Sequence, residues 1–266
     1  MFKGFYNLTS GMLTQQRNLN VVANNLVNVS TAGYKSDRYS SSTFDEVMLV
    51  RLGTKNKQDV EEIGGWSYIR ASDQMYTIYD QGVPEPTGIA LDFCIEGDGF
   101  FAVQQEDGQT VYTRSGSFSL DEEGYLCMPG RGRVLDPSGR IIYLGTDKIR
   151  GDDRGNIYSD SGLALGAGSN LGSYGLNYLG RVGVYTFEDN AALEHDQRGF
   201  FTGGGQATAS DDARVHWGYL ERANVDVVRE MTDMLTSQRA LQSCAQVSKM
   251  YDDVMSRAAN DIGRMG

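Results

Sequence analysis

Apolar residues recur three, four or seven positions apart along the first part of the chain. They fall at Phe5, Leu8, Met12, Leu19, Val22, Leu26 and Val29, with a polar gap at Gln15. This heptad pattern is typical of a helix that buries one face against another helix. Glycine is absent between Gly11 and Gly33, and Gly33 suits the left-handed residue that follows a helix end. We therefore predict a helix from Met1 to about Val29.

The other end of the chain shows the same periodicity from about Val225 to Ile262. One apolar stripe, with Gln238 in its gap, gives way to a neighbouring one. The first stripe is Val227, Met231, Met234, Leu241 and Ala245, and the second is Val247, Met250, Val254 and Ala258. Such a drift indicates a stutter or a change of facing partner. We predict a second helix, and a coiled-coil pairing of the two helices either within one chain or across subunits.

The middle of the chain, from about Pro84 to Trp217, is typical of strands and tight turns. Apolar and polar residues alternate from Leu91 to Glu96, as in a half-buried strand. Glycines follow one another at intervals of 15 or 16 residues, at Gly108, Gly124, Gly139 and Gly155. The last three each close a tetrad that begins with aspartate, which suits a type I turn followed by a residue of positive φ. We predict a β-meander of short hairpins.

These patterns predict an α+β fold in four segments. Residues 1–35 form an N-terminal assembly helix, 36–83 an extended, variable linker region, 84–217 a mainly antiparallel β domain, and 218–266 a C-terminal assembly helix. Within the linker region, Phe44 to Leu52 favours a short helix, and Trp66 to Tyr79 favours an extended chain. The polar run from Gly203 to Asp212 favours a surface loop.

Composition and charge narrow the possible functions. The chain has 266 residues, 40% of them hydrophobic, and a net charge of −11, which argues against nucleic acid or an anionic membrane as its main partner. The longest obvious apolar run, from Val47 to Val50, is far shorter than the roughly 20 residues of a membrane span. The N-terminus lacks the apolar core of a cleaved signal peptide. Cys94, Cys127 and Cys244 show no paired spacing, so neither a disulfide framework nor a zinc site is expected.

The sequence contains no recognisable motif of catalysis or cofactor binding. His195 and His216 lack the spacing of metal ligands, and neither a nucleophile elbow nor a phosphate-binding loop is present. The segment from Gly166 to Gly172 is one residue too long for a dinucleotide-binding turn and is expected to be a plain loop. Acidic pairs at 152–153, 211–212 and 252–253 lack the alternating ligands of a calcium loop. We expect no catalytic residue, cofactor or metal, although scattered residues could still converge in space.

Asparagines are frequent in the predicted N-terminal helix, at Asn7, Asn18, Asn20, Asn24, Asn25 and Asn28. Asparagine is a poor helix former, so this helix should need packing to form. The asparagines either face solvent or fix register and partner choice where they are buried. We expect self-assembly to use the apolar stripes together with nearby amide side chains. These residues are Phe5, Leu8, Met12, Leu19, Val22, Asn24, Asn25, Leu26, Asn28, Val29, Asn224, Val227, Met231, Met234, Gln238 and Leu241.

Four segments resemble signature motifs of the flagellar rod and hook proteins. Ser10 to Met12 and Asn24 to Lys35 resemble the N-terminal motif of that family, with departures at Val27 and Tyr34. Further along, Leu91–Phe101 is similar to its LDlaIxGxGFF segment, Tyr112–Phe118 to its YTRxGxF strand, and Gly218–Arg239 to its C-terminal motif, with Ala223 in place of the usual serine. The motifs occur in the family's order and cover both ends and the middle of the chain.

This resemblance implies a structural, non-enzymatic subunit of the periplasmic basal-body rod. Such subunits are exported unfolded by the flagellar type III apparatus, without a cleaved signal peptide, and stack into a helical tube with their terminal helices inside. The implied partners are other copies of the chain, neighbouring rod and hook proteins, and the surrounding ring proteins. Chain length and the single β domain favour a rod subunit over the longer hook subunit. The segment from Phe44 to Leu49 resembles the region after the N-terminal helix of the distal rod protein, which favours the distal over the proximal rod. The alternatives are a hook subunit or hook–rod adaptor and, more distantly, a soluble β-rich enzyme.

Overall fold

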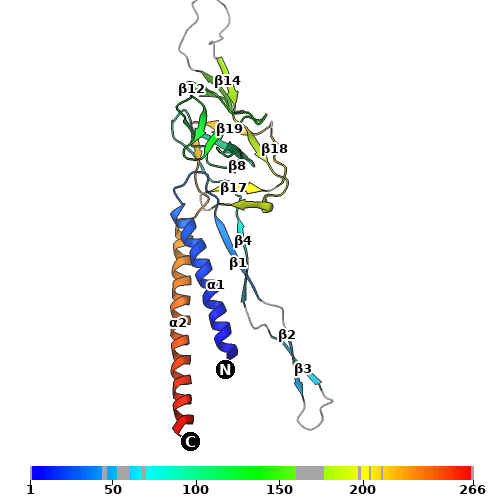
Figure 1. The fold of residues 1–266 in the computed structure, drawn as a ribbon, viewed down its shortest axis with the longest axis vertical. Helices are drawn as coiled ribbons and strands as arrows, with labels where there is room; N and C mark the ends of the chain where they lie inside the picture. Colours follow the sequence, from blue (N-terminus) through cyan, green and yellow to red (C-terminus); the bar gives the residue numbers. More distant parts are fainter. Residues whose placement is uncertain are drawn as a thin grey trace, which may run out of the picture. The chain divides into compact units, whose positions relative to one another are not determined.

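A computed structural model describes residues 2–43, 47–52, 60–66, 70–159, 177–196, 199–203, 205–210 and 212–264 (Figure 1). Its contacts divide the chain into two compact units. Unit 1 comprises Met1–Leu26, Asp37–Tyr76 and Asp226–Gly266, and unit 2 comprises Val27–Ser36 and Thr77–Val225. Each unit is therefore assembled from segments that lie far apart in the sequence. The predicted loop from Gly166 to Gly172 lies outside the described residues.

The two long helices of unit 1 lie side by side (Figure 1). α1 spans Phe2–Val27 and α2 spans Val227–Arg264. α2 begins at Val227 because the Asp226 carboxylate caps it, accepting hydrogen bonds from the N–H groups of Val228 (3.0 Å) and Arg229 (3.3 Å). Both predicted helices are confirmed, with limits shifted by about two residues. The prediction that Gly33 adopts a left-handed conformation is also confirmed, since its φ is +67°.

Unit 1 also contains two antiparallel strand pairs. β1 (Asp37–Thr43) pairs with β4 (Arg70–Thr77), and β2 (Val47–Leu52) pairs with β3 (Val60–Trp66). The short helix predicted over residues 44–52 is therefore wrong in its described part, 47–52. The run of Val47, Leu49 and Val50 suits a strand, and its cross-strand pairing with 60–66 outweighs the weak helical signal. The extended chain predicted for 66–79 is confirmed over β4.

Unit 2 is built around a mainly antiparallel sheet whose nine described strands run in the order β16-β17-β8-β7-β11-β10-β9, with β15 and β18 off this path. These strands are β7 (Phe100–Gln104), β8 (Thr110–Thr113), β9 (Ser119–Leu120), β10 (Leu126–Met128), β11 (Gly132–Val134), β15 (Val184–Thr186), β16 (Leu193–His195), β17 (Phe200–Gly203) and β18 (Thr208–Ala209). β7 pairs with β8 but also with β11 and β15. The predicted meander is thus right for the hairpins and wrong for the sheet order, because β11, β15 and β17 return to earlier strands.

Smaller pairings complete unit 2. The remaining strands are β5 (Pro84–Pro86), β6 (Phe93–Glu96), β12 (Ile149–Gly151), β13 (Asn156–Ser159), β14 (Asn177–Arg181), β19 (Arg214–Trp217) and β20 (Tyr219–Glu221), and η1 (Asn190–Ala192) is a short 3₁₀ turn. β19 pairs with β6, and β20 pairs with β5. Two segments separated by more than 100 residues in the sequence, at 84–96 and 214–221, are thereby joined. The last strands of unit 2, β19 and β20, are therefore hydrogen-bonded to its first strands, β6 and β5.

The predicted aspartate–glycine turns are confirmed. The N–H groups of Gly124, Gly139 and Gly155 donate to the carbonyls of Asp121 (3.1 Å), Asp136 (2.9 Å) and Asp152 (2.9 Å). All three glycines have φ between +75° and +87°, a conformation that costs other residues energy. The Asp121 carboxylate also accepts from the N–H groups of Glu123 and Tyr125, which shows why aspartate opens the tetrad. These local turns bring the short strands of unit 2 back toward one another.

The main hydrophobic core of unit 2 is formed by alternate residues of its strands. Phe93, Ile95, Phe101 and Val103 are fully buried in it. Val215 from β19 and Val184 from β15 join the same cluster. The last strands of the chain thus complete a core that begins at β6.

Candidate assembly site and buried ion cluster

α1 and α2 contact each other in an antiparallel arrangement that three pairs of residues define. The Asn25 side chain hydrogen-bonds to Glu230, and Asn18 Nδ2 donates to Ser237 Oγ at 2.9 Å. Nearer the start of α1, Gly4 lies against the ring hydroxyl of Tyr251. From the first pair to the second, the contact moves seven residues back along α1 and seven residues forward along α2. From the second pair to the third, it moves 14 residues along each helix. The contact line therefore keeps one heptad register over most of α1.

Polar and small residues line much of this contact. Asn25 is 1% exposed, and its amide also pairs with the backbone of Asp37 in both directions, at 2.9 and 3.0 Å. Thr14, Glu230 and Ser237 are buried as well. The two readings of the asparagines left open by the sequence are both realised, because Asn25 is buried and Asn7 and Asn20 are exposed. Register between the helices rests on directional hydrogen bonds, as with buried polar residues in coiled coils.

The apolar stripes do not coincide with this contact line. In α1, Phe5, Met12, Leu19 and Leu26 each lie one residue after Gly4, Gly11, Asn18 and Asn25, and they are half-buried except for Phe5, which is exposed. In α2, Met231 lies one residue after Glu230 of the contact line, whereas Met250 lies one residue before Tyr251. One residue is a turn of about 100° around a helix. The two halves of α2 therefore present apolar side chains on opposite flanks.

Much of α2's apolar surface is left open within a single chain. Val228 is 75% exposed, Met250 63% and Met231 50%. The other exposed large apolar residues of α2 are Leu235, Val247, Tyr251, Val254 and Met255. α2 has 38 residues and α1 has 26, so the turns of α2 after Tyr251 extend past the start of α1. Of the predicted assembly residues, Val22 is buried, and Leu8, Val29, Asn24, Asn28, Val227, Met234, Gln238 and Leu241 are half-buried.

Asn224, also predicted for assembly, makes intramolecular contacts in unit 2. Its Oδ1 accepts from the N–H of Ser36 at 2.7 Å, and its Nδ2 donates to the carbonyls of Ile78 and Asp80. All three partners are backbone groups of segments that precede the β strands of unit 2. In a single chain, this amide ties together residues 36, 78–80 and 224.

Glu230 is the charged residue of the helix contact. Burial raises the pKa of its carboxyl above the ordinary value, the hydrogen bond from Asn25 opposes that rise, and the nearby Asp233 charge adds to it. A cavity of about 160 Å³ lies beside it, lined among others by Asn18, Asn25 and Tyr39. The Tyr39 hydroxyl is buried and has no hydrogen-bond partner among the described residues. The end of the helix pair near Glu230 is thus polar and imperfectly packed.

Unit 2 contains a buried ion cluster that the sequence patterns did not predict. Glu221 Oε1 accepts from Lys35 Nζ at 2.7 Å, and Glu221 Oε2 accepts from Arg114 Nε at 2.6 Å. All three side chains are at most 3% exposed. The backbone N–H of Gly82 donates to Glu221 Oε1 at 2.8 Å, and that of Gly33 donates to the Glu221 carbonyl at 2.7 Å. One residue near the end of unit 2 thus binds four groups from three earlier segments.

Other N–H groups of Lys35 and Arg114 donate hydrogen bonds to backbone carbonyls. Arg114 donates to the carbonyls of Ile95, Gly97 and Gly99, and Lys35 Nζ donates to that of Asp80 at 2.8 Å. Burial lowers the pKa of the Lys35 ammonium, and the Glu221 carboxylate opposes that change. Burial also raises the pKa of the neighbouring Cys94 thiol to about 11, with a further contribution from the Glu221 charge.

Family profiles match three parts of the chain. Residues 5–35 match the flagella basal body rod protein profile, 94–157 the flagellar hook protein FlgE/F/G D1 domain, and 217–261 the flagellar basal body rod FlgEFG protein C-terminal profile. The chain is 30% identical to the flagellar basal-body rod protein FlgG of Bacillus subtilis, over 98% of this chain and 99% of that protein. The chain belongs to the flagellar basal-body rod protein family. The resemblance seen in the sequence motifs is thereby confirmed.

Two further relatives of this family also match along nearly their full length. FlgG of Caulobacter vibrioides is 28% identical over 92% of this chain and 94% of its own, and FlgF of the same organism is 29% identical over 97% and 95%. The three residues of the ion cluster can be placed in the segments that the family profiles match. Lys35, Arg114 and Glu221 each lie in a different one of the three matched segments. The three parts recognised separately in this family meet at one carboxylate.

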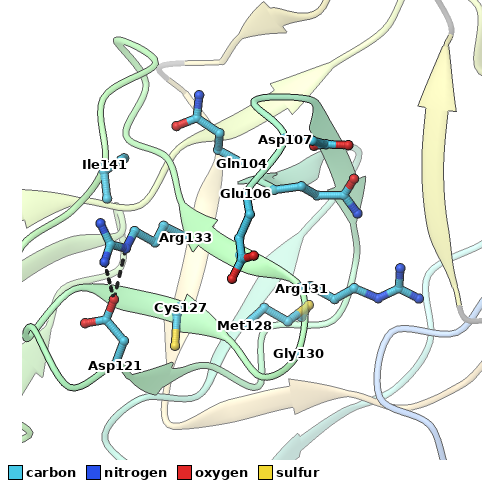
Figure 2. A pocket seen from close by; sticks show the side chains of 12 residues that line it. Gln104, Glu106, Asp107, Asp121, Cys127, Met128, Gly130, Arg131, Arg133 and Ile141 are labelled. Atoms are coloured by element: carbon cyan, nitrogen blue, oxygen red, sulfur yellow. Dashed lines mark hydrogen bonds and ion pairs between the residues drawn. The ribbon is translucent and has the colours of Figure 1, made fainter.

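A groove of about 890 Å³ lies beside strands β7, β10 and β11 of unit 2 (Figure 2). Figure 2 shows Arg133 pointing at Asp121, to which its Nε donates at 2.9 Å. Arg133 also pairs with Glu123, and Cys127 Sγ lies 3.3 Å from Ser119 Oγ. Two of the charged groups that line this groove, Asp121 and Arg133, are therefore engaged with each other.

The described residues contain no group of three or more histidine, cysteine or acidic side chains placed to hold a metal ion. Within the same part of the chain, neither helix is apolar enough over the length of a membrane span.

Proposed function

We propose that this chain is a FlgG-like structural subunit of the flagellar basal-body rod, and that it is not an enzyme. The observation that carries the proposal is the open apolar surface of α2, next to an intramolecular contact that is lined in large part by polar and small residues. Exposed apolar surface of this extent marks an interaction site. Family membership supports a site that binds other copies of the chain and neighbouring rod proteins.

The helix pair of one chain is then only part of a larger coiled-coil layer. Because the apolar residues of α2 lie on opposite flanks in its two halves, each α2 can meet two different neighbours. An interface between two different surfaces does not close on itself and generates a helical filament when copies are added. The assembly residues predicted from the sequence, among them Phe5, Leu26 and Met231, flank the intramolecular contact line and are suited to such intersubunit packing.

The remaining features of the proposal follow from the family. The subunit would be exported unfolded by the flagellar type III apparatus, without a cleaved signal peptide, and would occupy the periplasmic rod. Neighbouring rod and hook proteins and the surrounding rings would be its partners. Similarity to FlgG proteins over nearly the whole chain favours the distal rod, while FlgF, at 29% identity, is the proximal alternative.

Met231→Asp tests the assembly surface directly. Met231 is half exposed in the single chain, so the charge should leave the monomer folded but should not be tolerated once the residue is buried between subunits. Leu26→Asp is expected to act in the same way from α1, with unit 2 still folded. Electron cryotomography of strains that carry each variant in place of the natural gene should show basal bodies that stop short in the periplasm.

Asn20→Asp is the matched control, because Asn20 is exposed on the same helix as Leu26 and lies off the apolar stripe. It should support complete rods and hooks. Complete rods with Met231→Asp and Leu26→Asp would overturn the assembly role of the helices. In a deletion strain, the length of the remaining rod separates distal from proximal, and an intact rod without a hook would favour the hook or adaptor alternative.

A further inference from the structure

The carboxylate of Glu221 joins segments that are complete long before it in the chain. Lys35 follows α1, Gly82 precedes β5, and Arg114 follows β8, and all three donate to the Glu221 carboxylate. Glu221 itself ends β20, which pairs with β5, while β19 just before it pairs with β6. The segment 214–221 therefore supplies both a strand partner for β6 and the only carboxylate that the described contacts give to Lys35 and Arg114.

We propose that Glu221 is a folding latch, which lets unit 2 close only after residues 214–221 have joined it. Before Glu221 arrives, closing the cluster would bury two positive charges beside each other without a counterion. An arginine cannot lose its charge in a protein, so this state is disfavoured. The two cations therefore stay in water, and the loops that hold them stay open.

The backbone contacts of Arg114 extend this dependence into the core. Its guanidinium donates to the carbonyls of Ile95, Gly97 and Gly99, which connect β6 to β7. Ile95 also pairs with Val215 of β19, and both side chains are buried in the main core. The β6–β7 connection, the end of β8 and the segment 214–221 thus reach their final positions together.

Glu221 is synthesised after both of its cationic partners, so the latch delays the folding of unit 2 during synthesis. Synthesis from the N-terminus produces Lys35 and Arg114 well before Glu221, so the incomplete chain has the cations without their counterion. Unit 2 of such a chain stays open until nearly all of it has been made. If the proposed function is correct, this delay favours a subunit that must reach its export apparatus unfolded.

Refolding of the full chain tests the latch, and Trp217 provides the probe. Trp217 lies on β19 and donates from Nε1 to the Ala90 carbonyl at 2.8 Å, so its fluorescence reports the docking of the last strands. Trp66 is the other tryptophan of the chain, and Trp66→Phe removes its signal. Pulsed hydrogen exchange on the same protein, refolded at a concentration too low for association, gives the time at which β7 and β8 become protected.

We expect Trp217 docking and protection of β7 and β8 to share one rate constant. Glu221→Gln should slow both together by tenfold or more, whereas Glu85→Gln, which removes an exposed carboxylate of β5, should change neither. In the charge-free variant Lys35→Met/Arg114→Met/Glu221→Leu, protection of β7 and β8 should precede Trp217 docking.

Protection of β7 and β8 well before Trp217 docks in the Trp66→Phe protein would overturn the latch. Retained coupling in the charge-free variant would do the same, as would a charge-free variant that cannot refold, because the cluster would then be needed for packing whatever its charge. If Glu221→Gln does not fold, the kinetic order in the Trp66→Phe protein alone decides. None of these results depends on assembly, so a failed latch leaves the rod proposal intact.

Discussion

Gly33 illustrates how a single residue can be required by both its backbone conformation and its packing within unit 2. Its φ of +67° lies in the left-handed region, and a Cβ on it would lie 2.3 Å from the backbone nitrogen of Ser115. Its N–H donates to the Glu221 carbonyl. The glycine is therefore needed for its conformation and also because the strand end that carries Arg114 packs directly against it.

Gly33→Ala should destabilise unit 2 more than Gly88→Ala does. Gly88 has nearly the same φ, +70°, but a Cβ there would meet nothing within 4 Å. The conformational cost of either alanine is about 1–2 kcal/mol, and the steric overlap at Gly33 should add a further 1–3 kcal/mol or so. Denaturant unfolding of both variants measures the difference. Equal losses would mean that the contact with Ser115 relaxes freely.

The ion cluster shows how charged residues behave when a core forms around them. Lys35 and Arg114 are buried because Glu221 and five backbone carbonyl or amide groups satisfy them and their partner. An exposed ion pair such as Arg222 with Glu85, 3.5 Å apart, contributes little by comparison. Burial thus decides which of two similar-looking charge pairs matters for the fold.

At the scale of the elements, the helix pair combines two different surfaces. The contact between α1 and α2 includes residues such as Asn18, Asn25 and Ser237, which make directional hydrogen bonds. The flanking apolar residues carry more potential binding energy per side chain, since burying a large aliphatic side chain is worth about 1.5–3 kcal/mol. The polar contacts should therefore set the register of the two helices within one chain. Most of the stability of the helix pair should come from packing of the apolar residues against neighbouring subunits.

Glu230 should make the helix pair sensitive to pH. Its pKa is raised in the folded state, so between the ordinary value of 4.5 and the raised value the folded chain holds the proton more often than the unfolded chain does. Stability from this group is therefore fully present below 4.5 and falls as the pH rises through that window. Helical circular dichroism during thermal unfolding, compared between the natural chain and Glu230→Gln across the window, measures the effect.

Glu230→Gln keeps a hydrogen-bonding side chain beside Asn25 but cannot ionise. We expect its helix stability to change less with pH than that of the natural chain, and to exceed it above the window. Parallel profiles for the two proteins would show that the Glu230 carboxyl stays solvated in the helix pair.

At the scale of the whole molecule, the two compact units differ in what stabilises them. Unit 2 encloses a large buried core that includes Phe93, Phe101 and Leu126, whereas much of the apolar surface of α2 in unit 1 is exposed. A helix rich in asparagine and weakly packed is marginal on its own. The units should therefore unfold separately in the unassembled chain.

Two cysteines can report on the two units. Cys244 lies half-buried on α2, while Cys94 is buried in unit 2 with its pKa raised to about 11, so it reacts slowly until unit 2 opens. On heating in steps with iodoacetamide, we expect Cys244 to be alkylated together with the loss of helical signal, and Cys94 at a higher temperature. Mass spectrometry locates the labels. Labelling of both cysteines in a single transition would mean that the units unfold as one.

Local patterns in the sequence were enough for several features of this protein. Heptad stretches poor in glycine predicted both terminal helices, and the aspartate–glycine tetrads predicted turns at Gly124, Gly139 and Gly155. The motifs at both ends and in the middle indicated the flagellar rod and hook family. These features depend on residues close together in the sequence or on the order of the motifs. They can therefore be recognised in the sequence without the fold.

Only the tertiary structure decided which residues meet. The sheet order that brings β11 and β15 to β7, the strand at 47–52 in place of a helix, and the contact line one residue away from the apolar stripes were not predictable from spacing. Neither was the meeting of Lys35, Arg114 and Glu221, since their places in three separate motifs do not show that they are buried together. Contacts of this kind depend on how strands pair and helices rotate, and these are settled by the packing of the whole core.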